Sequence, residues 1–256
     1  MAENDCKTPL LCTRDGLRIV GEFYTPAIGD PPFPTVILSH GFRDDMDGTR
    51  SVATGLAAQG IAVCIFDFIG GGWNIKSDGD MQHMSVLTEA ADLEAVLGEV
   101  RKRPEVDANR LVLMGESQGG FVSTYVAAHH PEICALIAFY PAYVLQEDAR
   151  RRVSAPGYKP GHSEIMGVRL GEIYDTDALA FDIYDLMQGY EKPVLLIHGT
   201  ADSIVPLSYS ERAVRTFPNA RLLTIPGAEH GFVGEEERTA VEASAAFIRE
   251  QEMTHI

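Results

Sequence analysis

A serine between two glycines is the residue of this chain that best fits nucleophilic chemistry. Residues 115–119 read GESQG, after the apolar run 111–114 and before a stretch with helical character. Where a strand turns abruptly into a helix, the side chain at the corner is lifted clear of the sheet, and only small residues fit two positions before and after it. Gly115 and Gly119 meet this demand. Ser117 is therefore the candidate nucleophile, and an ordinary glycine-rich turn is the alternative.

An acid and a histidine follow two later apolar runs and could complete a hydrolytic site. Asp202 comes just after the run 194–198, and His230 lies on the loop after the run 220–225. Because the carboxyl ends of parallel strands meet at one edge of a sheet, we expect both side chains near Ser117. There His230 would take the serine proton, and Asp202 would fix the histidine tautomer and stabilise the imidazolium. Taken singly, either residue also fits a turn, a cap or a surface loop.

Other titratable residues are weaker candidates for this chemistry. His198 lies within an apolar run and fits a core or supporting histidine, while Glu229 points away from its neighbour His230 in any extended loop. The chain has no His-Glu-x-x-His motif and no other metal-ligand spacing. We therefore predict no metal and no cofactor.

Together these motifs resemble the α/β-hydrolase superfamily over nearly the whole chain. The resemblance rests on GESQG at 115–119, HGTAD at 198–202, GAEH at 227–230 and SHGF at 39–42. The chain order of serine, acid and histidine is also the one found in that superfamily. Within it, the sequence is most similar to the bacterial feruloyl (cinnamoyl) esterases. This closer similarity rests on FDF at 66–68, the glutamine after the serine and a modest insertion between residues 141 and 192.

Further site residues follow from the serine motif and from the resemblance. The backbone N–H of Gln118, at the start of a helix, would donate to an oxyanion, and the resemblance puts the second donor on Phe42. In similar esterases an aspartate and a tyrosine of the insertion meet the ring hydroxyl of the substrate. Asp148 and Tyr174 stand at comparable places here. Asp148 fits a solvated charged run equally well.

Two departures from the family pattern concern the choice of substrate. A glutamine that helps in some relatives has no counterpart near residues 154–155, and GGGW at 70–73 replaces a Gly-His-Gly-type loop. The expected activity is hydrolysis of ferulate-, p-coumarate- or caffeate-type esters through a Ser-His-Asp triad and an acyl-enzyme intermediate. A serine peptidase or aminopeptidase of the same fold and a non-catalytic binding protein remain as alternatives.

The expected elements place these motifs at the ends of strands. Two alternating segments around Asp15-Gly16 predict an antiparallel hairpin, and later strands alternate with helices. This pattern predicts one α/β-hydrolase domain over residues 1–256, with a mainly parallel sheet and helices on both faces. The predicted strands are 35–38, 61–66, 110–114, 135–139, 194–198 and 220–225, and the predicted helices are 51–59, 86–101, 117–129 and 235–251.

Residues 142–190 interrupt the alternation between the sixth and seventh strands. A long connection inside a compact domain is usually a functional cover or a disordered segment. This one holds five of the nine tyrosines, and disordered segments are poor in aromatic residues. The tyrosines favour an ordered cover, and the resemblance implies a lid over the serine.

The composition restricts the partners. A net charge of -16 would repel phosphate backbones, so we expect no nucleic acid and favour a small aromatic ester of little charge. Residues 1–6 hold neither a basic cluster nor an apolar core, so no signal peptide, no membrane partner and a cytoplasmic location are expected. The four cysteines form no Cys-x-x-Cys pair and fit free thiols, with Cys64 and Cys134 buried. A homodimer is compatible with these features.

Overall fold

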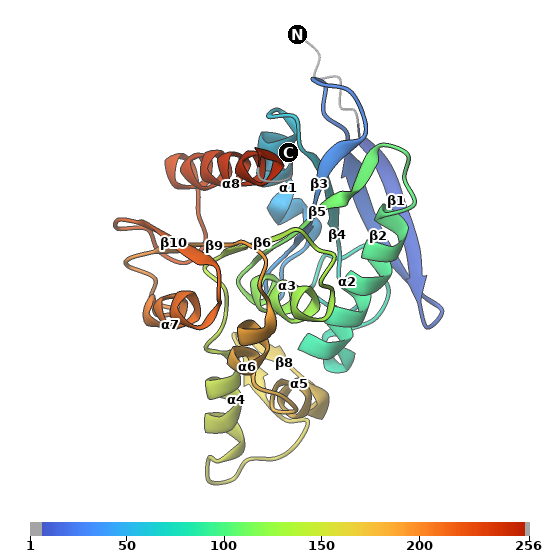
Figure 1. The fold of residues 1–256 in the computed structure, drawn as a ribbon. Coiled ribbons are helices and arrows are strands. Elements are labelled where there is room, and N and C mark those ends of the chain that lie inside the picture. The colour runs from blue at the N-terminus through green and yellow to red at the C-terminus, as the bar shows by residue number, and fades with distance from the viewer. Residues whose placement is uncertain (1–6, 254–256) are drawn as a thin grey trace.

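An eight-stranded sheet runs through the molecule and carries helices on both faces (Figure 1). The computed structural model describes residues 7–253, so Cys6 and the other residues used to predict location lie outside the described part. The strands lie in the order β1-β2-β4-β3-β5-β6-β9-β10. Their bounds are β1 (Lys7–Arg14), β2 (Leu17–Tyr24), β3 (Phe33–Ser39), β4 (Ala62–Phe66), β5 (Val106–Glu116), β6 (Ala135–Phe139), β9 (Val194–Gly199) and β10 (Ala220–Ile225).

The N-terminal strands form the antiparallel edge of this sheet. β1 pairs with β2 across Asp15 and Gly16, whose φ angles of 52° and 83° give the left-handed turn that such a hairpin needs. β2 then pairs antiparallel with β4, and every further pair from β4 to β10 is parallel. The predicted α/β-hydrolase fold with a mainly parallel sheet is thereby confirmed. β5 begins at Val106, before the predicted 110, because the polar residues 107–110 hide its start.

The helices follow the predicted alternation, with one addition. They are α1 (Arg50–Ala57), α2 (Val86–Val100), α3 (Gln118–His129), α7 (Ser208–Thr216) and α8 (Glu235–Met253), with single 3₁₀ turns η1 (Met46–Thr49) and η2 (Met81–His83). α7 was not predicted, since only Ser210 and Ala213 on it are buried and its sequence reads as polar. Within residues 7–253, no helix is both long enough and apolar enough to cross a membrane.

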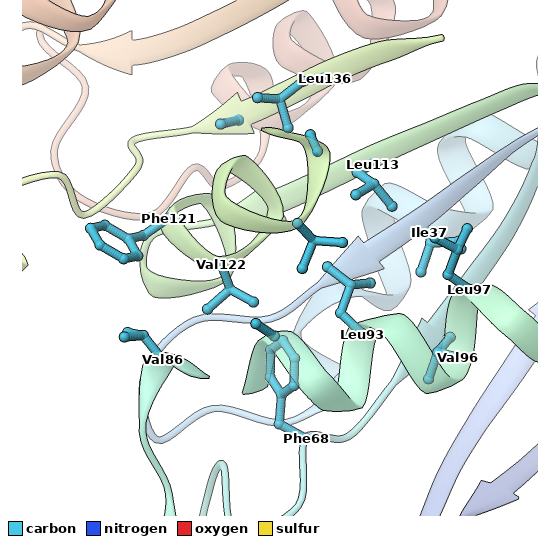
Figure 2. Packing of buried hydrophobic residues seen from close by; sticks show 14 of the residues in the cluster. Ile37, Phe68, Val86, Leu93, Val96, Leu97, Leu113, Phe121, Val122 and Leu136 are labelled. Carbon is cyan, nitrogen blue, oxygen red and sulfur yellow. The ribbon is translucent and has the colours of Figure 1, made fainter. Parts of the chain in front are cut away.

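Two hydrophobic layers hold the helices against the sheet. The central strand β3 is buried at every position, as expected where both faces are covered. On one face, Leu93 and Leu97 of α2 and Val122 of α3 pack in the same cluster as Ile37 of β3 (Figure 2). Burying a side chain of this kind fully contributes about 1.5–3 kcal/mol relative to leaving it exposed. On the other face, α1 and α8 cover a second cluster.

The start of α2 is fixed by a reciprocal cap. The Ser85 side chain accepts from the backbone N–H of Thr88, and the Thr88 hydroxyl accepts from the backbone N–H of Ser85. Such a capping box satisfies two N–H groups that the helix itself leaves without partners. The cap places Glu89, one residue further on, in the first turn, where it is buried.

The segment between β6 and β9 is folded rather than loop-like. It contains α4 (Leu145–Val153), the short strands β7 (Glu164–Ile165) and β8 (Val168–Arg169), α5 (Glu172–Ala178) and α6 (Ile183–Gly189). Figure 1 shows these helices gathered at one end of the molecule. The buried carboxylate of Asp175 joins α5 to α4 and to the loop after it, because it accepts hydrogen bonds from Arg152, Tyr158 and Ser163.

The described cysteines are free thiols. Cys12 and Cys64 are buried, whereas Cys134 is half-buried rather than fully enclosed as expected.

Candidate active site

Ser117 lies at a tight corner between β5 and α3. Its φ of 51° and ψ of -117° are strained for a residue with a side chain, which is typical of a nucleophile at a strand-to-helix turn. A Cβ added at Gly115 would lie 2.2 Å from the carbonyl oxygen of Gly119, and one added at Gly119 would lie 2.3 Å from that of His40. Only glycine fits either position, as the spacing of the motif predicts.

The structure brings Ser117, Asp202 and His230 together. His230 Nε2 lies 3.0 Å from Ser117 Oγ, and His230 Nδ1 lies 2.8 Å from Asp202 Oδ2. The carboxylate accepts the Nδ1–H, which leaves Nε2 free to accept the serine proton. The three residues come from the ends of β5 and β9 and from the loop after β10, so the parallel sheet places them at one edge.

Asp202 is held as a carboxylate by four donors. Its Oδ1 accepts from the backbone N–H of Ile204 at 2.9 Å and of Val205 at 2.8 Å. Its Oδ2 faces His230 and also His198 Nε2, at 3.1 Å. Burial raises the pKa of Asp202, but the hydrogen bonds from His198, His230 and Val205 outweigh it and hold that pKa far below its ordinary value. The Asp202 side chain is therefore ionised in the neutral pH range.

His198 supports Asp202 from within the core, in keeping with the supporting role considered from its position in the sequence. Its Nε2 lies 2.9 Å from the Val205 carbonyl oxygen as well as close to Asp202, so this nitrogen carries the proton. Its Nδ1 then accepts from the Ser210 hydroxyl at 2.7 Å. Ser210 lies on α7, the helix that the sequence did not reveal.

The loop after β3 forms the opposite wall, beside the nucleophile. His40 is buried; its Nδ1–H donates to the Gly41 carbonyl at 2.8 Å, and its Nε2 accepts from the Phe68 N–H at 3.2 Å. Burial lowers the pKa of His40, so the ring is neutral, as an accepting Nε2 requires. A Cβ on Gly41 would lie 3.3 Å from that of Ser117. This loop therefore sets Phe42 next to Ser117, and Phe42 and Gln118 both line the crevice.

The glycine run at 70–73 packs beneath this loop. Gly72 forms a β-bridge with Arg43, and a Cβ there would lie 2.0 Å from the carbonyl oxygen of Asp44. Trp73 is 62% exposed, with the Arg43 guanidinium 5.3 Å from its ring centre. The glycines that replace the family loop thus let the backbone at residue 72 approach the backbone at residues 43–44 closely. Trp73 does not line the crevice.

A cavity of about 300 Å³ opens at Ser117. It lies between the catalytic loops and the insertion, and both predicted substrate contacts, Asp148 of α4 and Tyr174 of α5, line it. Tyr174 packs against Phe42 with ring centres 5.7 Å apart and donates its hydroxyl hydrogen to Gln118 Oε1 at 2.7 Å. Asp148 pairs with Arg151 at 3.1 Å and is partly exposed.

Glu116 and Tyr140 are crevice residues that the sequence did not single out. The Tyr140 hydroxyl donates to Glu116 Oε2 at 2.9 Å. The rings of Tyr140 and His230 contact each other edge to face, with their centres 4.8 Å apart. Burial raises the pKa of Glu116 to about 7. Their positions in the sequence could have indicated this, because Glu116 ends β5 and Tyr140 directly follows β6, the next strand in the sheet.

No group of three or more histidine, cysteine, aspartate or glutamate side chains in the described part of the chain could hold a metal ion. The crevice residues instead offer proton transfer between a hydroxyl, an imidazole and a carboxylate.

The fold and this constellation define an α/β-hydrolase. A sequence model for the serine aminopeptidase S33 family matches residues 30–168, and one for TAP-like proteins matches residues 182–255. The first match spans more than half of the 256 residues, so the chain belongs to the serine aminopeptidase S33 family.

Known proteins of several kinds are similar to the chain. The uncharacterized protein YfhR of Escherichia coli strain K12 is 28% identical over 85% of this chain and 70% of its own length. A thermostable monoacylglycerol lipase from a Bacillus species is 29% identical over 40% of this chain and 38% of its own length. Among solved structures, Est1E from Butyrivibrio proteoclasticus with ferulic acid bound is 28% identical, with a TM-score of 0.85. The match covers 94% of this chain and 98% of that one.

Proposed function

We propose that this protein is a serine carboxylic ester hydrolase that cleaves hydroxycinnamate esters of the ferulate, p-coumarate or caffeate type. The observation that carries the proposal is the serine–histidine–carboxylate line from Ser117 to Asp202, opening into a cavity between the catalytic loops and the insertion. The likeness to Est1E, whose structure holds ferulic acid, supports the choice of acyl group.

The proposed reaction has two halves. Ser117 Oγ attacks the ester carbonyl carbon while His230 Nε2 takes its proton, and the C–O bond to the alcohol breaks as His230 returns that proton to the leaving oxygen. Water then attacks the acyl-serine with His230 again as base, which releases the acid. The backbone N–H groups of Phe42 and Gln118 would stabilise the oxyanion in both halves, and the ionised Asp202 would stabilise the imidazolium.

The insertion would supply the acyl pocket and act as a lid. Phe42 and Tyr174 offer aromatic walls for a planar cinnamoyl group, and Asp148 offers an acceptor for its ring hydroxyl. The Tyr174 hydroxyl, which donates to Gln118, keeps lone pairs that can accept from the same ring hydroxyl.

A substrate panel tests the activity. Methyl ferulate, p-coumarate and caffeate should be hydrolysed, and Ser117→Ala should abolish that turnover while ferulate binding persists. The family match to serine aminopeptidases favours one rival, a peptidase with the same triad. Turnover of aminoacyl nitroanilides alone would establish that rival. Failure of Ser117 to react with a fluorophosphonate would favour a non-catalytic binding protein.

Asp148→Ala tests the acyl pocket. We expect kcat/KM for methyl ferulate to fall about 10- to 100-fold, the range for one hydrogen bond to a charged group, while methyl cinnamate, which has no ring hydroxyl, changes little. Glu147→Ala is the matched control, because this neighbouring acid lies on the same helix but not in the cavity lining. An equal loss on both esters would remove Asp148 from the ring-hydroxyl site.

A further inference from the structure

A chain of buried polar side chains connects the insertion to the residue after the nucleophile. The Tyr174 hydroxyl donates to Gln118 Oε1 at 2.7 Å, and Gln118 Nε2 donates to Glu89 Oε2 at 2.8 Å. Their exposed fractions are 4%, 2% and 1%. Because an unpaired polar group at such depth is costly, these bonds fix which way the Gln118 amide faces.

Both ends of this chain are anchored independently of Gln118. Tyr174 contacts the Phe42 ring and the Arg152 guanidinium, each 5.7 Å from its ring centre. Glu89 sits in the first turn of α2, directly after the capping box. The Gln118 side chain therefore bridges Tyr174 on α5 of the insertion and Glu89 on α2.

The backbone around Gln118 leaves its side chain a part in holding the corner in position. It is the first residue of α3, where the backbone N–H lacks an intrahelical acceptor, and it follows a strained corner at Ser117. The Ser117 carbonyl of the same peptide unit accepts from the backbone N–H groups of Gly120, Phe121 and Ala142, so the backbone sets the plane of this peptide. The side-chain bonds of Gln118 act on the position of the whole corner relative to α2 and the insertion. An oxyanion donor stabilises charge only when it is already aimed at the place where the charge develops.

We propose that Tyr174 and Glu89 are positioning residues that hold the Gln118 backbone N–H in place as an oxyanion donor. Contacts made by the insertion then determine how well this N–H stabilises the oxyanion formed at Ser117. The inference rests on the proposed serine hydrolase function and deepens it. Burial raises the pKa of Glu89 to about 8, despite the Gln118 hydrogen bond. A neutral Glu89 places no negative charge near the developing oxyanion.

The test uses p-nitrophenyl acetate, whose acyl group has no ring to meet the insertion. Tyr174→Phe and Glu89→Leu should each lower kcat about tenfold with KM within twofold. Their affinity for a trifluoromethyl ketone, which forms a tetrahedral oxyanion adduct with the serine, should fall by the same factor. Glu89→Gln, which keeps an acceptor for the Gln118 amide, should restore activity to within threefold of the wild type.

Controls separate positioning from stability and from substrate choice. Tyr184→Phe removes another buried tyrosine hydroxyl of the insertion, one that bonds to the Tyr209 carbonyl, and should leave kcat unchanged. Thermal unfolding verifies that each variant folds. If a variant does not fold, Gln118→Leu, which removes both side-chain hydrogen bonds at once, is measured in its place. Unchanged ketone affinity in folded Tyr174→Phe or Glu89→Leu would overturn the inference. A wild-type protein that hydrolyses p-nitrophenyl acetate but not methyl ferulate would instead contradict only the proposed acyl group.

Discussion

At the scale of single residues, the site depends on which protons each side chain holds. Asp202 is surrounded by donors alone, so it can only be an acceptor, and its charge fixes the proton of His230 on Nδ1. The correct tautomer leaves Nε2 facing Ser117. The arrangement of these three side chains is thus set by hydrogen-bond types as much as by distance.

Asp202→Asn tests this assignment. The amide would offer its NH2 group to a ring that also donates, so the histidine would favour the wrong tautomer, and kcat on methyl ferulate should fall about 10³- to 10⁴-fold with little change in KM. Glu229→Gln is the matched control, since Glu229 lies beside His230 and bonds to Ser203 instead. If Glu229→Gln cost as much activity as Asp202→Asn, the assignment of the acid would be wrong.

Sequence reasoning at this scale places a residue in space where that residue is tied to the end of a strand. The expected proximity of Ser117, Asp202 and His230 agrees with the structure, because the run before each one fixes its place in the sheet. Their catalytic roles stay a prediction. Glu89 and Tyr140 were not found, because their roles arise from contacts across the fold that no local spacing records. A glutamate in an amphipathic helix reads as solvent-exposed until the packing shows it buried.

At the scale of elements, the sheet was largely predictable and the insertion was not. Buried parallel strands are continuous apolar runs, so β3, β4, β6 and β9 could be located from sequence. β10, an edge strand that is only partly buried, was located from its apolar run alone. The helices α4, α5 and α6 are short and join through polar contacts, which leave no strong hydrophobic period. Tyrosine content alone predicted that this segment is ordered.

Asp175→Asn should loosen the insertion without unfolding the sheet. The change removes the charge that pairs with the Arg152 guanidinium and turns an acceptor of the Ser163 and Tyr158 hydroxyls into a partial donor. The loss should be about 2–4 kcal/mol, near the lower part of the range for breaking a buried pair, because Arg152 is partly exposed. Limited proteolysis should then cut within residues 154–167 at least tenfold faster.

Asp185→Asn is the matched control for this prediction, since it removes an exposed carboxylate from α6 of the same insertion. Its cleavage rate should equal that of the wild type. If Asp175→Asn were cleaved no faster than the wild type, apolar packing rather than the carboxylate would hold the insertion together.

At the scale of the whole molecule, three carboxyl groups make the folded chain less stable as pH rises from mildly acidic to neutral. Glu89 and Asp92 are buried, and Glu116 is half-buried. Burial raises the pKa of Glu89 to about 8, of Glu116 to about 7 and of Asp92 to about 6. Between their ordinary values near 4 and these values, the folded chain binds more protons than the unfolded chain. The free energy of unfolding therefore falls as pH rises through that window. Asp202, whose pKa is lowered, acts in the opposite sense, but only under more acidic conditions.

We therefore expect the protein to be most stable near pH 5 and to lose stability steadily up to pH 8, by up to about 3 kcal/mol from Glu89 alone. The net charge of -16 adds self-repulsion that grows in the same direction. Urea unfolding at pH 5, 6, 7 and 8 measures the slope. Glu89→Gln should flatten it, whereas Glu242→Gln, an exposed acid on α8, should leave it unchanged. A free energy of unfolding that rises from pH 5 to 8 would show that these carboxyl groups ionise freely in the folded chain, and that the hydrogen bonds of Glu89 are those of a charged group.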